Sequence, residues 1–240
     1  MDPRIAAIKA RTENIKRIIP VASGKGGVGK SLVSTGLALA LKEKGFKVGL
    51  MDMDFNGASD HIILGASVDE FPEEEKGVVP PEIHGLRFMS IVYYTQNNPT
   101  PLRGAEISNA LIELLAITRW GELDYLIIDT PPGMSDTFLD ILRFLSRGEF
   151  LIVTTPSPLS YNVVDKLIAL LKERNHKIVG IVKNMKRGEV ISAVNPATKY
   201  NIPVLVEIPV VDDIDDVIGD PEKLMRSVFG EKMKILCDKI

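Results

Sequence analysis

The chain has 240 residues, of which 45% are hydrophobic and 25% are charged, and its formal net charge is −3. These fractions are close to the averages for folded globular proteins and exclude a wholly disordered chain. The sequence contains one cysteine, Cys237, which excludes an internal disulfide and a cysteine-rich zinc site within one chain. We therefore expect a reducing, cytoplasmic location.

The sequence carries no strong signal for membrane insertion or nucleic-acid binding. Residues 1–17 contain seven charged side chains and lack the apolar segment of a secretory signal. The two longest charge-free runs, 88–102 and 150–164, have 15 residues each, fewer than the roughly 18 apolar residues of a membrane-spanning helix. Slight acidity gives no general reason to expect a nucleic-acid partner.

Short apolar runs alternate with segments of helical periodicity along the chain. The predicted strands are Ile18–Ala22, Val48–Met51, Leu86–Ile91, Tyr125–Ile128, Phe150–Thr154, Ile178–Val182 and Val204–Ile208. The predicted helices are Ser31–Lys44, Ala105–Arg119, Ser135–Ser146, Leu159–Arg174 and Glu222–Ile240. Nearly all-apolar strands that alternate with helices predict an α/β fold, in which a mostly parallel sheet has helices on both faces.

We expect residues 1–240 to form a single domain, because no long linker or repeat of fixed period interrupts the pattern. Residues 1–15 are predicted to form an N-terminal arm and residues 221–240 a C-terminal helix. Residues 67–82 are rich in Asp, Glu and Pro. This composition favours a solvated loop or lid, with an acidic docking surface as the alternative.

A phosphate-binding motif directly follows the first predicted strand. Residues 24–31 read Gly-Lys-Gly-Gly-Val-Gly-Lys-Ser, match the pattern G-x-x-x-x-G-K-[ST] and open a predicted helix. The glycines let backbone N–H groups wrap a phosphate, and the helix N-terminus adds partial positive charge. Lys30 supplies a full charge near the β- and γ-phosphates, and Ser31 is placed to ligate Mg²⁺. Pro20, within the strand, cannot donate a ladder hydrogen bond and predicts a local irregularity.

Acidic residues after two other predicted strands complete the expected site. Asp129 occupies the place of a Walker B aspartate, which holds Mg²⁺ through water, and the turn 130–133 that follows is placed to sense the γ-phosphate. Asp52 and Asp54 end the second strand at the same edge of the sheet, where ligands bind in open α/β folds. A functional role is favoured for Asp54, while Asp52 stays open between a structural and a functional role.

The loop resembles the deviant Walker A motif of the MinD/ParA/ArsA/NifH group of P-loop ATPases, which has a second lysine at the position of Lys25. Within that group the chain is most similar to the Mrp (ApbC) family of iron–sulfur carriers. The stretches that carry this resemblance are Pro20–Ser31, Asp52–Ser59, Arg103–Gly104, Trp120–Gly133 and Gly180–Met185. They span about residues 16 to 210, and the stretch 120–133 is the most family-specific.

The resemblance implies a P-loop NTPase of the MinD type, with ATP and Mg²⁺ as cofactors, ATP-dependent homodimers and slow hydrolysis. Lys25 resembles the lysine that reaches the partner subunit's nucleotide, and Asp54 the residue that positions the attacking water. The implied catalytic residues are Lys25, Lys30 and Asp54. The implied Mg²⁺ ligands are Ser31, Asp54 and Asp129. The implied nucleotide-binding residues are Gly24, Lys25, Gly26, Gly27, Val28, Gly29, Lys30, Ser31, Leu32, Gly133, Asn184 and Pro209. In the family, the counterpart of Asn184 hydrogen-bonds adenine and the loop around Pro209 closes over the base.

The sequence departs from the family pattern at one position. Family members carry Cys-x-x-Cys after the Asn-Met stretch, where two subunits bridge a [4Fe–4S] cluster, whereas this chain continues with Lys186–Ile191. A cluster held by thiolates needs four of them. A homodimer of this chain offers two copies of Cys237, so binding of a cluster in the usual way stays open.

Signals outside the motifs are weaker. The segment Glu222–Ile240 loosely resembles the amphipathic membrane anchor of MinD proteins, but its mild basic bias and Gly230 favour docking against its own sheet. Cys237 is expected to be a small apolar residue of that helix, and Trp120 to lie in or near the core. No metal site is predicted from the three scattered histidines His61, His84 and His176.

The leading hypothesis is a cytoplasmic, Mg²⁺-dependent ATPase that dimerises around two ATP molecules and loads or releases cargo in iron–sulfur cluster assembly or transfer. Its expected partners are client or scaffold proteins. The missing cysteine pair keeps two alternatives open: a MinD/ParA-like positioning ATPase on a membrane or DNA, and an ATP-regulated adaptor whose partner supplies the thiolates. The Mrp-like stretches count against the positioning role.

Overall fold

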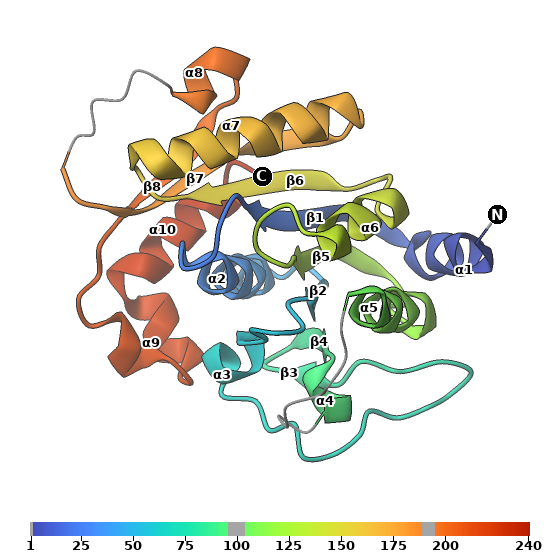
Figure 1. Ribbon diagram of the computed structural model, residues 1–240. Coiled ribbons are helices and arrows are strands. Elements are labelled where there is room, and N and C mark those ends of the chain that lie inside the picture. The colour runs from blue at the N-terminus through green and yellow to red at the C-terminus, as the bar shows by residue number, and fades with distance from the viewer. Residues whose placement is uncertain (1, 96–103, 189–194) are drawn as a thin grey trace.

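An eight-stranded sheet runs through the centre of the molecule, and helices cover both of its faces (Figure 1). The computed structural model describes residues 2–95, 104–188 and 195–240. Three features of the sequence fall outside these residues: Arg103, the end of the charge-free run 88–102, and residues 189–191 at the site of the missing cysteine pair.

The seven predicted strands are all present. The strands are β1 Ile15–Ser23, β2 Val48–Asp52, β3 Glu82–Ile83, β4 Leu86–Ser90, β5 Leu123–Asp129, β6 Glu149–Thr154, β7 Lys177–Lys186 and β8 Val204–Pro209. Their order is β3-β4-β2-β5-β1-β6-β7-β8, and all neighbours pair in parallel except β3 and β4. The sequence does not predict β3, because two residues carry no periodic signal.

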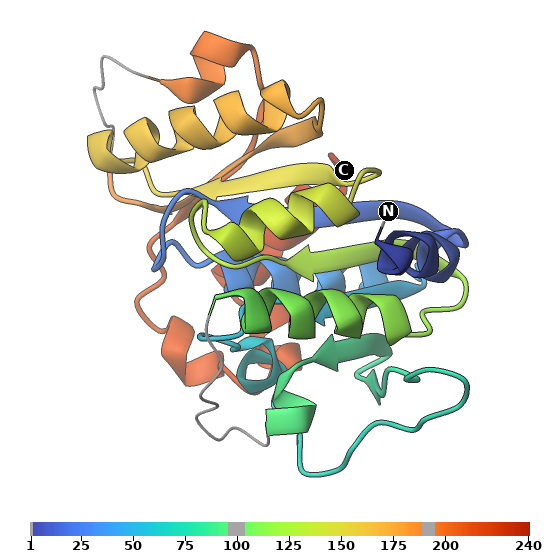
Figure 2. The same ribbon diagram turned by 45° about the vertical axis from the view of Figure 1, so that its right-hand side comes forward.

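Crossover direction decides which face each helix covers. The helices are α1 Pro3–Thr12, α2 Lys30–Glu43, α3 Asp60–Leu64, α4 Val92–Thr95, α5 Ala105–Ile117, α6 Asp136–Phe144, α7 Pro158–Glu173, α8 Pro196–Tyr200, α9 Pro221–Arg226 and α10 Val228–Cys237, with a 3₁₀ turn at Ile214–Val217. The β1–α2–β2 and β5–α6–β6 connections run in opposite directions along the sheet. Right-handed crossovers therefore place α2 on one face and α6 on the other, with α10 beside α2 and with α5 and α7 beside α6 (Figures 1 and 2). The predicted α/β fold is confirmed.

Polar side chains fix where several helices begin. Ser135 accepts a hydrogen bond from Phe138 N at the start of α6, and Ser157 accepts one from Ser160 N at the start of α7. Such caps satisfy N–H groups that have no partner within the helix. In the N-terminal arm, Asp2 caps α1 in the same way, so this segment is helical and packs against α5.

The predicted C-terminal helix 221–240 is two helices in the structure. Ser227 ends α9 and caps α10, because its hydroxyl accepts a hydrogen bond from Gly230 N. Gly230 therefore lies inside the first turn of α10, where its missing side chain lets Met225 approach. The prediction of one continuous helix was wrong, because helical periodicity does not show a cap within an apolar segment.

The C-terminal helix α10 packs against α2 and β8. At Gly36 of α2, an added Cβ would lie 2.6 Å from Phe229 Cε1 and 2.8 Å from Met233 Cγ, so only glycine permits this approach. Phe229 and Met233 are buried, and Cys237 is 7% exposed in the same core. Much of the apolar surface of this segment is therefore covered by the protein, while Val228 and Ile235 stay exposed. None of the helices in the described ranges has the length and apolar character needed to cross a bilayer.

Pro20 lies within the central strand β1, as the sequence requires, and the sheet accommodates it. It pairs in register with Ile128 of β5. On the other side of β1, the ladder with β6 begins at Val21. Before that point, a single bridge joins Ile18 of β1 to Gly148, which precedes β6. Pro20 therefore lies outside the β1–β6 ladder, so the N–H group that proline lacks removes no hydrogen bond from that ladder.

The core beneath β2 is built around Trp120, whose side chain is fully buried. An added Cβ on Gly49 would lie 2.9 Å from Trp120 Cε3 and 2.8 Å from Leu123 Cδ1. We expect Gly49→Ala to lower the free energy of unfolding by about 1–3 kcal/mol, because the core has no room for the methyl group. Urea unfolding followed by circular dichroism measures this change.

Gly26→Ala is the matched control for that measurement, because an added Cβ at Gly26 meets no atom within 4 Å. We expect its free energy of unfolding to stay within about 0.5 kcal/mol of the wild type. Equal stabilities for Gly49→Ala and the wild type would contradict the tight packing of Trp120 against β2.

Candidate functional site

The predicted phosphate loop joins β1 to α2 at the carboxyl edge of the sheet, toward which the strand arrowheads point in Figure 2. Gly27 and Gly29 have φ angles of 74° and 78°, in the left-handed region that favours glycine. Gly29 is also the N-cap of α2, and an added Cβ there would collide with the Asn184 side chain. The glycines thus shape the loop and allow β7 to approach it.

Lys30 and Ser31 begin α2 and turn toward the end of β5. Lys30 Nζ lies 2.7 Å from Asp129 Oδ1, with the lysine 6% exposed and Asp129 fully buried. The ammonium group has three N–H donors, so those that do not point at Asp129 are left for another acceptor. Ser31 and Ser34 donate hydroxyl hydrogen bonds to the two Asp129 oxygens, at 2.7 and 2.8 Å.

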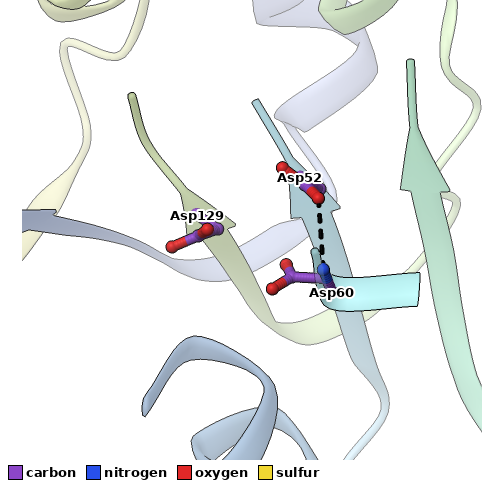
Figure 3. A group of neighbouring side chains, drawn as sticks. All are labelled: Asp52, Asp60 and Asp129. Atoms are coloured by element: carbon purple, nitrogen blue, oxygen red, sulfur yellow. Dashed lines mark hydrogen bonds between the residues drawn. The ribbon is translucent and has the colours of Figure 1, made fainter. Parts of the chain in front are cut away.

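Three buried carboxyl groups meet next to this loop: Asp52, Asp60 and Asp129 (Figure 3). Asp52 ends β2 and Asp129 ends β5, and the two residues are in register. Asp60 begins α3 and points toward Asp129 in Figure 3, while its backbone N–H donates to Asp52 Oδ2 at 3.3 Å. Ligand oxygens of the three groups lie within 4.8 Å of one another.

Asp52 also shapes the loop that carries Asp54. Its two oxygens accept backbone hydrogen bonds from Asp54 N at 3.0 Å, Ser59 N at 3.1 Å and Asp60 N. Asp54 itself is partly exposed and accepts a hydrogen bond from Gly57 N at 3.2 Å. Asp52 is therefore a structural residue of the loop that also lies within the acidic group.

Asp60 is a member of this acidic group that no sequence motif predicts. Its Oδ1 accepts a hydrogen bond from Thr35 Oγ1 at 3.1 Å, and its Oδ2 has no partner in the described part of the chain although it is buried. The signal that could have revealed it is an acidic residue at the start of the otherwise apolar helix α3, soon after the strand-end carboxylates. Nothing local in the sequence indicates that this helix folds back against β2.

Burial and mutual repulsion disfavour negative charge in this acidic group. Burial, together with the charge of Asp129, raises the pKa of Asp52 to about 7. Burial and the charges of Asp129 and Asp52 raise the pKa of Asp60 well above its usual range, and burial also raises the pKa of Asp54. For Lys30, burial lowers the pKa, but attraction to Asp129, Asp54 and Asp60 outweighs it, so the pKa is raised.

An apolar pocket of about 330 Å³ adjoins the phosphate loop. Leu32, Asn184 and Pro209 line it, so the structure brings these three predicted residues together. Asn184 is 4% exposed, and its Nδ2 donates to Val28 O at 2.9 Å. Phe229 of α10 lines the same pocket, a contribution that the sequence analysis missed because the docking of the tail is a tertiary contact.

The remaining predicted residues lie around the loop. Gly133 N donates to Ser23 O at 2.9 Å, which holds the turn after β5 against the loop. An added Cβ on Gly24 would lie 2.9 Å from Val163 Cγ1, so α7 packs against the start of the loop. Lys25 is exposed, and its side chain makes no hydrogen bond or ion pair with any described residue.

Cys237 lies far from these residues. It is close to Lys44, which caps the end of α2 opposite to Lys30. Since α2 has 14 residues, the two ends are about 20 Å apart at a rise of about 1.5 Å per residue. Burial raises the pKa of the Cys237 thiol, which disfavours the thiolate that metal binding requires.

The oxygen donors at the loop fit a small, hard cation together with a phosphate. Ser31 Oγ lies 2.7 Å from Asp129 Oδ2, and Asp54 is close enough to both Lys30 and Asp129 for their charges to affect its pKa. Hydroxyl and carboxylate oxygens are the ligands that Mg²⁺ prefers. The hydrogen-bond donors that Lys30 keeps free would suit phosphate oxygens at the same place.

The chain is similar in sequence to P-loop NTPases and to proteins named for iron–sulfur cluster carriage and assembly. The family model described as ParA, NUBPL iron-transfer P-loop NTPase, matches residues 14–227. The iron-sulfur cluster carrier protein of Pseudomonas fragi is 34% identical over 91% of this chain and 84% of its own length. The cytosolic Fe-S cluster assembly factor Nubp2 homolog 2 of Drosophila yakuba is 44% identical over 72% of this chain and 70% of its own. The chain spans 64–84% of the length of the bacterial carriers it matches.

Solved structures agree with this placement. The nucleotide-binding protein from Archaeoglobus fulgidus, in complex with ADP, has a TM-score of 0.76 and 32% identity over 90% of this chain and 91% of that chain. The cell division ATPase MinD of Pyrococcus furiosus shares the fold, with a TM-score of 0.71 and 22% identity over 94% and 98% of the two chains. Because the family match extends over every parallel strand and includes the loop and strand ends that form the site, the chain belongs to the ParA/NUBPL family of iron-transfer P-loop NTPases.

Proposed function

We propose that this chain is a cytoplasmic, Mg²⁺-dependent ATPase that dimerises around ATP and acts as a switch in iron–sulfur cluster assembly or transfer. We further propose that residues 1–240 work as one P-loop ATPase domain. The observation that carries the proposal is the contact of Lys30 and Ser31 with Asp129, beside a loop in which Gly27 and Gly29 have positive φ angles. This is the arrangement that P-loop chemistry requires.

Each residue of the site has a role that follows from its place. The N-terminus of α2 and the Lys30 ammonium group would bind the β- and γ-phosphates. Ser31, Asp129 and Asp54 would hold Mg²⁺, which neutralises charge on the phosphates when bound. Asp54, on the exposed loop after β2, is placed to orient the attacking water. We expect ATP hydrolysis to be slow, because a group from a second subunit is needed to stabilise the phosphoryl group during transfer.

The apolar pocket suits the adenine base. Its lining by Leu32, Pro209 and Phe229 offers surfaces on which an aromatic base can pack. The Asn184 amide lies at the boundary between this pocket and the loop, since its Nδ2 bonds Val28 O. Its Oδ1 is an acceptor suited to an exocyclic amino group, which supports ATP as the nucleotide.

The face around Lys25 supports a homodimer. Lys25 extends into solvent beside the loop, so it is placed to reach a nucleotide in a second copy rather than its own. Leu159, at the start of α7, is 79% exposed, and lies one helical turn from Val163, which packs against Gly24. An exposed apolar residue next to the loop is suited to contact between subunits.

The lack of a cysteine pair limits how such a dimer could handle a cluster. Each subunit has one thiol, and Cys237 is buried in the core at the far end of α2. A homodimer therefore cannot supply the four thiolates of a [4Fe–4S] cluster. This favours an ATP-regulated adaptor, in which a client or scaffold protein supplies the missing thiolates.

The first test of the nucleotide site is Lys30→Ala. We expect ATP affinity to fall by about 100-fold or more, because charge-assisted hydrogen bonds to phosphate are lost. Isothermal titration calorimetry measures the affinity, and circular dichroism confirms that the variant is folded. Lys166→Ala removes an exposed lysine of α7 and should bind ATP as the wild type does. Unchanged affinity in folded Lys30→Ala would contradict the site.

The second test separates binding from dimerisation. Lys25→Ala should bind ATP with nearly unchanged affinity, since the side chain faces solvent, but should lose ATP-dependent dimerisation and hydrolysis. Light scattering with ATP reports the mass in solution, and phosphate release reports turnover. If the variant still forms dimers and hydrolyses ATP at the wild-type rate, Lys25 does not act across subunits.

The third test concerns the cluster. Anaerobic reconstitution with iron and sulfide should leave no stable [4Fe–4S] cluster on this chain alone, because it lacks the thiolates. Absorbance and iron counted per dimer are the measurements. Four irons per dimer that disappear in Cys237→Ala would overturn the adaptor role and restore direct carriage, while leaving the ATPase proposal intact.

A further inference from the structure

A second pocket, of about 370 Å³, lies at the amino edge of the sheet, opposite the phosphate loop. It is bordered by the end of α1, the acidic loop, the start of β4 and the segment between α5 and β5, which lie on the same side of the molecule in Figure 2. Its position follows from the strand register: Arg87 pairs with Gly49, whereas Asp52 at the other end of β2 pairs with Ser90.

Three arginines from separate elements converge on this pocket: Arg11, Arg87 and Arg119. Arg11 donates to Lys76 O at 2.8 Å and to Ala116 O at 3.3 Å. Arg87 donates to Trp120 O. These partners are neutral backbone carbonyls, which position the guanidinium groups without balancing their charge.

One carboxylate already sits in the pocket. Glu75 Oε2 accepts a hydrogen bond from Arg119 Nη1 at 2.8 Å. The Glu75 side chain is 74% exposed and belongs to the acidic loop, so it can leave at little cost. Among the lining residues, Glu75 is the single acid against three guanidinium groups, so the pocket keeps a net positive charge.

Donors predominate among the side-chain polar groups here, and the Asn14 amide, which also lines the pocket, offers both a donor and an acceptor. A guanidinium group has five N–H donors and no acceptor, and an indole has one donor. Trp120 lines the pocket, and its buried Nε1 has no acceptor within the described ranges. An acceptor suits a pocket in which donors predominate, and planar guanidinium groups match carboxylates through paired hydrogen bonds.

We propose that this pocket binds a small anion that carries two or more carboxylate groups. Its volume lies within the range of small-molecule sites, about 300–1,000 Å³, and three arginines can engage more than one carboxylate at once. Glu75 occupies part of the site in the free protein and is displaced on binding. The site is separate from the nucleotide site and does not depend on the function proposed above.

Titration of the full chain with citrate at low ionic strength tests this proposal by calorimetry. Arg11→Gln and Arg87→Gln should each weaken citrate binding about tenfold, because a charge-assisted contact is lost. Arg226→Gln is the matched control, since Arg226 is an exposed arginine of α9, and should bind citrate as the wild type does. An equal loss in this control would overturn the assignment to the pocket.

Glu75→Gln gives a readout that misfolding cannot imitate. Without the competing carboxylate, citrate should bind about fivefold more tightly, the gain expected when one exposed ion pair no longer competes. If neither the wild type nor Glu75→Gln binds citrate, the proposal is wrong. Sulfate that binds as tightly as citrate would overturn the preference for carboxylates. Hexaglutamate that binds more tightly than citrate would overturn the preference for a small anion.

Discussion

One buried ammonium group balances the negative charge at the carboxyl edge of the sheet. Lys30 Nζ lies 2.7 Å from Asp129 Oδ1, in the space where Asp52 and Asp60 are also buried. Removing charge from water is costly unless it is paired. Lys30 therefore offsets part of the cost of burying carboxylates where the ends of β2 and β5 meet the start of α2. The lysine that would bind phosphate thus also stabilises this edge.

The rest of the site depends on how closely other elements approach this edge. Gly29 leaves room for Asn184 of β7, and Gly36 leaves room for α10. These two contacts bring Asn184 and Phe229 to the same apolar pocket. Phe229 of the C-terminal segment therefore lines the pocket beside the phosphate loop.

The two edges of the sheet differ in charge because parallel strands collect like ends together. The carboxyl edge gathers buried acids around Lys30, while the amino edge gathers Arg11, Arg87 and Arg119 around a single acid, Glu75. Cys237 belongs to neither group of charged residues and is buried near the far end of α2.

The sequence by itself determined the sheet and the phosphate loop, because apolar runs, glycines and the Lys30-Ser31 pair act over a few neighbouring residues. It also placed Asp129 and Asp52 at one edge, since parallel strands end together. Tertiary structure alone decided the approach of Asn184 to the loop and the burial of Asp60 beside Asp129. These features join residues far apart in the chain, and a local pattern carries no record of which distant side chain fills the space beside it.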